Sequence, residues 1–320
     1  MPEQKILLQF SKAWELINSS QNIFLTTHEG TDGDDLGSLL AMCLGLKDMG
    51  KQVTSAVKGG VPKSLSFLPG TETVDDKIYE KKYDLIITFG CSRISRIGFD
   101  SRAFEGVPLI NFDHHPDNTE FGTVNVVDPK ISSVAELVYL FINQFNLPVT
   151  KDVATSLLTG IFTDTGGFKH SNTSASTLEV AAALLRKGAR IDRIAYQTMG
   201  KKRPSTIKAW SKGLEHTRLD PDKQMVFSVL TEDDLKEIGA TDEDLDGFVE
   251  LINNIPEARF ALLLRQDGDT IKGSLRSELH KQVDVSQIAK NFGGGGHKLA
   301  SGFKIKGRLV KSGNAWKIED

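Results

Sequence analysis

Apolar residues recur in the first part of the chain at two different spacings, which predict alternating strands and helices. Residues 5–19 repeat large apolar side chains about once per helical turn, whereas residues 22–27 form a short apolar run. The apolar run over residues 83–89 lacks polar alternation, which is typical of a strand in a buried parallel sheet. The other elements predicted here are strands over 52–57 and 107–112 and helices over 36–49, 133–144, 154–162 and 176–187. Strands that alternate with helices predict an α/β fold with a doubly wound, mainly parallel sheet.

The pattern changes after residue 190, and the change predicts a second, smaller domain. Residues 191–216 are charged and helical, with a break at Pro204, and we expect them to connect two domains. Strands are then predicted over 224–230, 258–265 and 270–275, and helices over 241–252 and 284–291. The predicted organisation is an α/β domain over residues 1–190, a helical linker over 191–216 and a mixed α/β domain over 217–320.

Composition narrows the class of protein. A chain of 320 residues is long enough for two domains with cores of their own. The net charge of −3 gives no sign of a large nucleic-acid surface, and two cysteines cannot build a disulfide framework. No run of about 18 apolar residues could cross a membrane, and the first residues lack the apolar block of a signal peptide. We therefore expect a cytoplasmic protein that does not contact membranes.

The segment Asp113-His114-His115 follows directly on the predicted strand over 107–112. The carboxyl ends of strands are where open α/β sheets bind their ligands. An acid and two imidazoles at such an end could bind a metal ion or transfer protons, although a solvated loop with a chance cluster has the same composition. Other stretches with similar chemistry decide between these alternatives.

A second cluster, His28, Asp32 and Asp34, lies in a glycine-containing loop after the strand over 22–27. One imidazole and two carboxylates suit Mn²⁺, Mg²⁺, Fe²⁺ or Zn²⁺. Acidic residues are also favoured at a helix N-terminus without any metal, and Asp35 could be only such a cap. The three residues offer more ligands than a cap needs, which favours a metal site.

Two weaker signals lie further along the chain. Asp164 follows a predicted apolar helix, where the helix dipole disfavours an acid, and this makes it a functional candidate. The glycines over 293–296 can direct backbone N–H groups toward a phosphate, although glycine runs are also common turns. Arg276 could bind a phosphate with its guanidinium fork, or could be an ordinary surface arginine.

Together these motifs resemble those of the DHH phosphoesterase family, in the subgroup with a DHH-associated C-terminal domain. Oligoribonuclease (nano-RNase) and pAp-phosphatase proteins belong to this subgroup, and the RecJ exonucleases are relatives. The matching segments are His28-x-x-x-Asp32-Gly33-Asp34-x-x-Gly37-Ser38, Asp113-His114-His115-Pro116-x-Asn118-Thr119, residues 160–168 and Gly293-Gly294-Gly295-Gly296-His297-x-x-Ala300-Ser301-Gly302. They follow the order of the family and span nearly the whole chain.

The resemblance implies a site for two Mn²⁺ ions in a cleft between the two domains, with Mg²⁺, Fe²⁺ or Zn²⁺, or a single ion, as alternatives. The implied ligands are His28 and Asp32 for one ion and Asp34, His114 and Asp164 for the other. His115 and Asp113 would be the catalytic pair, with His115 close to the scissile phosphate. The implied substrate-binding residues are Arg276, Gly294, Gly295, Gly296 and His297.

Gly90 departs from the family pattern. The resemblance implies an Asp that bridges the two ions at the tip of the strand ending at Phe89, and this chain has Gly90 there, followed by Cys91. A Cys91 thiolate could replace the carboxylate and favour Zn²⁺ or Fe²⁺. Glu29 or Asp35 could instead support a site with altered metal occupancy, or the protein could bind its nucleotide without hydrolysing it.

The implied activity is that of a metal-dependent phosphoesterase. Its substrates would be short oligoribonucleotides, cyclic dinucleotides or their linear products, or adenosine 3′,5′-bisphosphate, attacked in line by a metal-activated hydroxide. The alternative is a nucleotide-binding pseudo-enzyme weakened by Gly90. Inorganic pyrophosphatase is a third class, against which the glycine loop argues. The sequence leaves open which substrate the protein hydrolyses and which ion it binds. It also leaves open the oligomeric state, which could be a homodimer.

Overall fold

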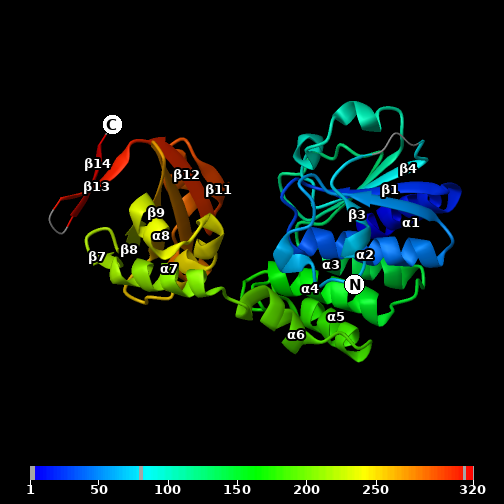
Figure 1. The fold of residues 1–320 in the computed structure, drawn as a ribbon. Helices are drawn as coiled ribbons and strands as arrows, with labels where there is room; N and C mark the ends of the chain where they lie inside the picture. The colour runs from blue at the N-terminus through cyan, green and yellow to red at the C-terminus, as the bar shows by residue number, and fades with distance from the viewer. Residues whose placement is uncertain (1–3, 79–81, 313–314, 320) are drawn as a thin grey trace. The chain divides into compact units, whose positions relative to one another are not determined.

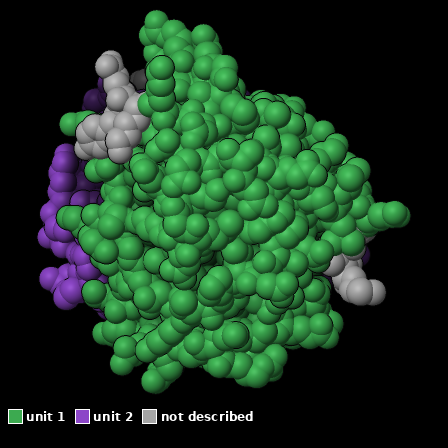
Figure 2. All heavy atoms as spheres, turned by 90° about the vertical axis from the view of Figure 1, so that its right-hand side faces the viewer, with its two compact units in different colours: residues 1–201 green, residues 202–320 purple. Residues whose placement is uncertain are grey.

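Two compact units, residues 1–201 and 202–320, make up the computed structural model and are coloured separately in Figure 2. The structure describes residues 4–78, 82–312 and 315–319. The division falls inside the segment over 191–216 that the sequence predicts as a linker. Its first part, α6 (Ile191–Ala195), packs on α4 in the first unit, whereas α7 (Pro204–Glu215) packs on α8 in the second.

The first unit contains a sheet of six parallel strands in the order β3-β2-β1-β4-β5-β6 (Figure 1). The strands are β1 (Asn22–Thr27), β2 (Gln52–Ala56), β3 (Val74–Asp75), β4 (Leu85–Phe89), β5 (Leu109–Asp113) and β6 (Val124–Val127). The predicted parallel sheet is confirmed. The strand order reverses between β1 and β4, and the crevice at the carboxyl ends of such strands is where open α/β sheets bind ligands.

Helices cover one face of this sheet and enclose the main apolar core. They are α1 (Gln4–Ser19), α2 (Gly33–Asp48), α3 (Val134–Gln144), α4 (Lys151–Asp164) and α5 (Ala175–Arg186). α4 packs on α2 and α3, and α5 packs on α4, so that the helices form more than one layer on this side (Figure 1). Ser133 and Thr150 begin α3 and α4 by accepting hydrogen bonds from the backbone N–H groups of Glu136 and Val153.

The opposite face of the sheet is covered by short 3₁₀ helices and loops. Strand residues alternate between the two faces, so that Ile23 and Ile87 join the main core while Phe24 and Ile86 join a smaller apolar cluster. That smaller cluster is closed by η3 (Ile94–Ile97) and η4 (Ser101–Phe104). The first unit has further short helical segments, the 3₁₀ turns η1 (Lys63–Leu65) and η2 (Thr71–Thr73) and the π-helical η5 (Tyr196–Gly200), whereas the 3₁₀ turn η7 (Leu279–Lys281) belongs to the second unit.

The second unit has a mixed sheet in the order β11-β12-β10-β9-β8-β7, in which only the β8–β9 pair of the described strands is parallel. Its strands are β7 (Arg218–Asp220), β8 (Met225–Leu230), β9 (Phe260–Asp267), β10 (Thr270–Ser277), β11 (Gly295–His297) and β12 (Ala300–Lys306), with a separate hairpin of β13 (Arg308–Ser312) and β14 (Ala315–Glu319). Its further helices are α8 (Glu232–Ile238), α9 (Phe248–Asn253) and α10 (Val285–Lys290). The predicted mixed α/β character of this part is confirmed.

One predicted helix of the second unit is wrong in extent. The sequence predicts a continuous helix over 241–252, but the structure has η6 (Asp242–Leu245) and α9 separated by Gly247. Gly247 adopts a left-handed backbone with φ of 87°, which ends one helical turn before the next begins. Of the helices that the structure describes, none has the length and apolar character needed to span a membrane.

Candidate metal centre

His28 and Asp32 lie between the end of β1 and the start of α2. Asp32 is the N-cap of α2, and its Oδ1 accepts hydrogen bonds from the backbone N–H groups of Asp34 (3.0 Å) and Asp35 (3.1 Å). The helix N-cap that the sequence offers as an alternative to a metal site is therefore present, but the capping residue is Asp32 and not Asp35. The ring of His28 is buried, and its Nδ1 lies 2.8 Å from the carbonyl oxygen of Glu29.

The contact of His28 decides which ring nitrogen can bind a cation. A carbonyl oxygen accepts but cannot donate, so Nδ1 carries the proton and Nε2 presents its lone pair. This is the arrangement usual for histidines that bind metals. Nε2 faces Asp35, whose Oδ2 is 2.8 Å away. His28, Asp32 and Asp35 each offer a ligand atom within 4.8 Å of the others, and we call them ligand group 1.

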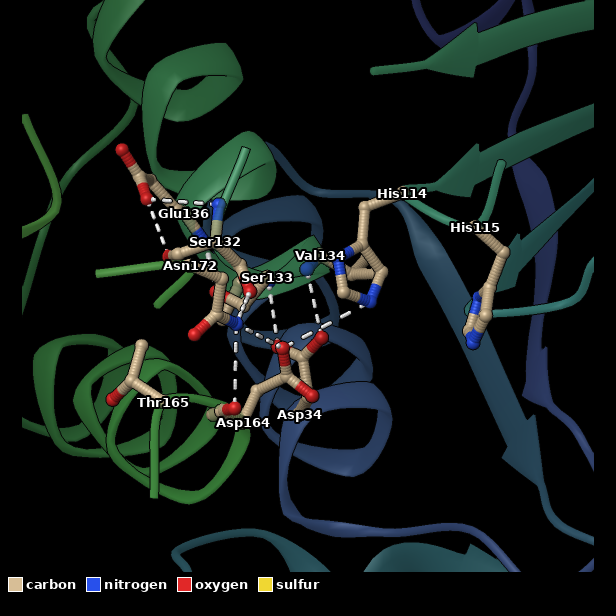
Figure 3. Close-up of polar contacts among 12 residues, drawn as sticks. Asp34, His114, His115, Ser132, Ser133, Val134, Glu136, Asp164, Thr165 and Asn172 are labelled. Carbon is tan, nitrogen blue, oxygen red and sulfur yellow. Dashed lines mark hydrogen bonds and ion pairs between the residues drawn. The ribbon is translucent and has the colours of Figure 1, made fainter. Parts of the chain in front are cut away.

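Asp34, His114 and Asp164 form a second such set, ligand group 2, with the same separation limit of 4.8 Å. They come from the first turn of α2, the loop after β5 and the last residue of α4. Figure 3 shows the imidazole of His114 directed at the two carboxylates, and Nε2 of His114 lies 3.9 Å from Oδ2 of Asp164. The structure thus brings together the five residues that the sequence predicts as metal ligands, and adds Asp35.

Helix α3 holds the carboxylate of Asp34 in place. The backbone N–H of Val134 donates to Oδ2 of Asp34 over 2.7 Å (Figure 3). The next N–H, at Ala135, donates to Oδ1 of Asp34 over 2.8 Å. Asp164 is held by Asn172, whose Nδ2 donates to Oδ2 over 3.2 Å. Sequence reasoning missed both contacts, because neither partner carries a motif and both depend on how the helices pack.

Glycines let α2 and α4 approach closely enough to place Asp34 beside Asp164. A Cβ on Gly37 would lie 2.4 Å from the carbonyl oxygen of Ser156, and a Cβ on Gly160 would lie 2.9 Å from Oδ1 of Asp34. Any larger residue at either position would push the two helices apart. The geometry of ligand group 2 therefore depends on residues that bind nothing themselves.

Replacing Gly37 with alanine is expected to lower the free energy of unfolding by about 1–3 kcal/mol, the usual cost of overpacking a core. Gly45→Ala in the same helix is the matched control. Its Cβ would meet only Leu147 at 3.9 Å, so better helix propensity should raise stability by about 0.5–1 kcal/mol. Urea unfolding of the metal-free protein measures both changes, and equal stabilities of the two variants would contradict the close approach.

Asp113 orients His115. The side chain of Asp113 is fully buried, and its Oδ1 lies 2.7 Å from Nδ1 of His115. The same oxygen accepts from the backbone N–H of His114, and Nδ2 of Asn118 donates to the other oxygen. The hydrogen bond that His115 donates to Asp113 raises the pKa of His115, although partial burial opposes it. Burial by itself raises the pKa of Asp113, but the hydrogen bonds of His115 and Asn118 outweigh it and hold that pKa below its usual value.

The carboxylates of both groups repel one another. Burial, followed by the charge of Asp164, raises the pKa of Asp34 to about 8. Burial and the charge of Asp32 raise the pKa of Asp164 to about 7. Buried acids crowded in this way are stabilised by cations, and oxygen-rich sets with imidazole suit Mn²⁺ or Mg²⁺ better than soft metals. The residues present therefore fit divalent cations.

Two of the three residues that could replace a carboxylate at position 90, Cys91 and Glu29, do not face the ligand groups. The Cys91 side chain is buried in the apolar cluster on the opposite face of the sheet, and burial raises the pKa of its thiol well above the usual value. A neutral thiol is a poor metal ligand, which argues against a Cys91 thiolate. Glu29 is exposed, and its side chain lies next to Gly98. Only Asp35 faces the site.

The predicted substrate-binding residues gather at one edge of the sheet in the second unit. Arg276 of β10 and His297 of β11 both pair with Ala300 of β12, so the two side chains share one face. Nε of Arg276 donates to Glu250 over 2.6 Å. The glycine run is less open than a loop, since residues 295–297 pair as β11. Phosphate binding here stays a prediction.

The chain matches two family models. The model described as the DHH family, N-terminal domain, matches residues 22–161, and the DHHA1 domain model matches residues 222–315. A protein of Thermus thermophilus named bifunctional oligoribonuclease and PAP phosphatase NrnA is 33% identical, over 89% of this chain and 84% of the relative. A probable protein of the same name from Streptococcus mutans is 31% identical, over 89% of this chain and 90% of the relative.

A solved structure supports the fold over nearly the whole length. The crystal structure of an exopolyphosphatase-related protein from Bacteroides fragilis superimposes with a TM-score of 0.87 at 25% identity. The match covers 94% of this chain and 92% of the other. Both units therefore have counterparts in one known protein.

Proposed function

We propose, from the premise that the chain belongs to the DHH family, that this phosphoesterase hydrolyses short oligoribonucleotides and the 3′-phosphate of adenosine 3′,5′-bisphosphate with Mn²⁺ as its cofactor. The observation that carries the proposal is the pair of ligand groups at the carboxyl ends of β1 and β5. The names of the relatives, which join oligoribonuclease and PAP phosphatase activities, support the choice of substrates.

Divalent cations bound by the two ligand groups would lower the pKa of water and neutralise charge that develops on the phosphoester oxygens. The protein supplies their ligands in fixed positions. Nε2 of His28 presents a lone pair because Nδ1 is engaged with a carbonyl oxygen, and Asp34 is held by the backbone of α3. Such pre-arranged ligands reduce the reorganisation needed during the reaction.

His115 is the residue of this chain best suited to handle a proton. Its hydrogen bond to buried Asp113 holds the ring in one orientation and favours its protonated form. A protonated imidazole can donate to a phosphate oxygen or to the leaving oxygen of the substrate. We therefore assign His115 the catalytic role and Asp113 a positioning role.

Hydrolysis after removal and return of the cation tests the proposal. We expect the purified protein with added Mn²⁺ to convert a 5′-phosphorylated RNA dinucleotide to mononucleotides and to release phosphate from adenosine 3′,5′-bisphosphate. Treatment with EDTA should abolish both reactions, and Mn²⁺ should restore them. Protein that binds Mn²⁺ and the dinucleotide but yields no product would support the pseudo-enzyme instead.

Arg276 is proposed to bind a substrate phosphate from the second unit. Arg276→Ala is expected to raise the KM for the RNA dinucleotide by about 10- to 100-fold, since a hydrogen bond to a charged group contributes about 1.5–3 kcal/mol. Arg308→Ala is the matched control, because Arg308 is also paired with an acid, Asp269, over 2.8 Å. Steady-state kinetics compares the two. A KM for Arg276→Ala equal to that of the control would remove Arg276 from the substrate site.

A further inference from the structure

The carboxylate of Asp35 fills the space in front of Gly90. A Cβ built on Gly90 would lie 1.8 Å from Oδ1, 2.2 Å from Cγ and 2.4 Å from Oδ2 of Asp35. No side chain at position 90 could coexist with Asp35 in this position. Gly90 directly follows β4, whose neighbours β1 and β5 lead into the two ligand groups. Asp35 thus brings a carboxylate from α2 to the place that a side chain just after β4 would otherwise occupy.

Asp35 is also buried, and most of the charged groups around its carboxylate are acidic. Only 3% of its surface is exposed. Its Oδ2 contacts Nε2 of His28, but the other charges facing it are acidic: those of Asp32, Asp34, Asp113 and Asp164. Asp32 belongs to ligand group 1, Asp34 and Asp164 belong to ligand group 2, and Asp113 is the last residue of β5. A carboxylate that faces all of them lies where it could serve either group.

Neither simpler role accounts for this burial. An acid that only favours the dipole of α2 would be equally effective in solvent, and Asp32 already caps the helix. An ion pair with His28 would need a proton on Nε2 in addition to the one on Nδ1. It would then offset a single negative charge among several. Desolvating so many carboxylates is costly unless a positive charge of more than one unit lies between them.

We propose that Asp35 is a ligand for the divalent cations, and that Asp35 on the helix and Gly90 on the strand form a matched pair which keeps a carboxylate at the end of β4. This inference rests on the proposed metal-dependent function. It means that Gly90 does not mark a decayed site, because the acid has moved to a different backbone position. Gly90 is required at this strand end as long as residue 35 is an acid.

Metal binding, measured without any substrate, tests the role of Asp35. Mn²⁺ titration calorimetry and metal analysis of desalted protein should give two ions for the wild type. Asp35→Asn should weaken binding of at least one ion by 10-fold or more. Asp48→Asn is the matched control, an exposed acid at the other end of α2, and should bind as the wild type does. Unchanged binding in a folded Asp35→Asn variant would overturn the proposal.

Moving the carboxylate back to the strand tests the matched pair. Gly90→Asp alone should lower both stability and Mn²⁺ affinity, because its side chain would collide with Asp35 and its φ of +64° disfavours side chains. The double variant Asp35→Ala/Gly90→Asp removes the collision and should bind Mn²⁺ more tightly than Asp35→Ala. Double-variant binding no better than that of the more weakly binding single variant would overturn the pairing.

These outcomes separate the inference from the proposed function. If Asp35→Asn loses an ion while the wild type binds Mn²⁺ but cleaves no RNA, the ligand role of Asp35 stands and the proposed function fails. If the wild type cleaves RNA and Asp35→Asn keeps both ions, the proposed function stands and the inference fails. Circular dichroism of each variant establishes that the comparison is made between folded proteins.

Discussion

Replacing Asp164 with asparagine is expected to abolish hydrolysis and, at the same time, to stabilise the metal-free protein. The substitution keeps the shape of the side chain and an oxygen that can accept from Asn172. It removes a negative charge from ligand group 2, and loss of a cation there should reduce kcat by at least about 100-fold. Without metal, the same change removes repulsion from Asp34, so the free energy of unfolding at pH 8 should rise by roughly 1–3 kcal/mol.

The opposite signs of the two effects make this variant informative. Asp152→Asn, at the exposed start of the same helix, should change neither kcat nor metal content. Thermal unfolding in EDTA and in Mn²⁺ gives the second readout, since added Mn²⁺ should stabilise Asp164→Asn less than it stabilises the wild type. A variant that is less stable than the wild type in EDTA would mean that the Asp164 carboxylate stabilises the metal-free fold, and that its charge does not destabilise it.

Loss of the His115 side chain should have the second largest effect. His115→Ala is expected to lower kcat by about 10²- to 10⁴-fold, the usual contribution of a positioned proton donor. The two ligand groups remain intact in this variant, so it should bind as much Mn²⁺ as the wild type. The expected pattern is therefore a full complement of metal with little turnover.

Two comparisons separate a chemical role of His115 from a structural one. His280→Ala removes an exposed histidine of the second unit and should leave kcat unchanged. Added imidazole should restore part of the activity of His115→Ala, because its protonated form can enter the space left by the ring and donate a proton there. Wild-type turnover by His115→Ala would show that this residue handles no proton in the slow step.

The first half of the fold is readable from local patterns because its strands are buried and apolar. The predicted strand over 22–27 is β1 residue for residue, and the predicted apolar strand over 83–89 contains β4. The sequence does not predict β6, because a strand of four residues that alternates buried and partly exposed positions carries too short a pattern. The glycine run predicts a loop, whereas residues 295–297 pair along the edge of a sheet.

The residues of the candidate site can be predicted from the sequence only in part. The sequence singles out Asp164 as an acid beyond the predicted helix over 154–162, and the structure extends α4 to include Asp164 as its last residue. For Gly90 the sequence left Cys91, Glu29 and Asp35 open as replacements, since a sequence shows which side chain is absent but not which other one fills its space. Asp35 stands next to Asp34 in the chain and resembles a helix cap. Its contact with position 90 exists only because α2 packs over β4.

The hydrogen bonds from the backbone of α3 to Asp34 have a consequence for the resistance of the protein to proteolysis. Val134, whose N–H binds Asp34, lies 100 residues further along the chain, and Asp164 belongs to yet another helix. An ion held by Asp34 and Asp164 would act as a staple that closes long loops of the chain at one point, much as a disulfide does. The supply of the ion would then govern how long the first unit withstands proteases, as well as how fast it turns over substrate.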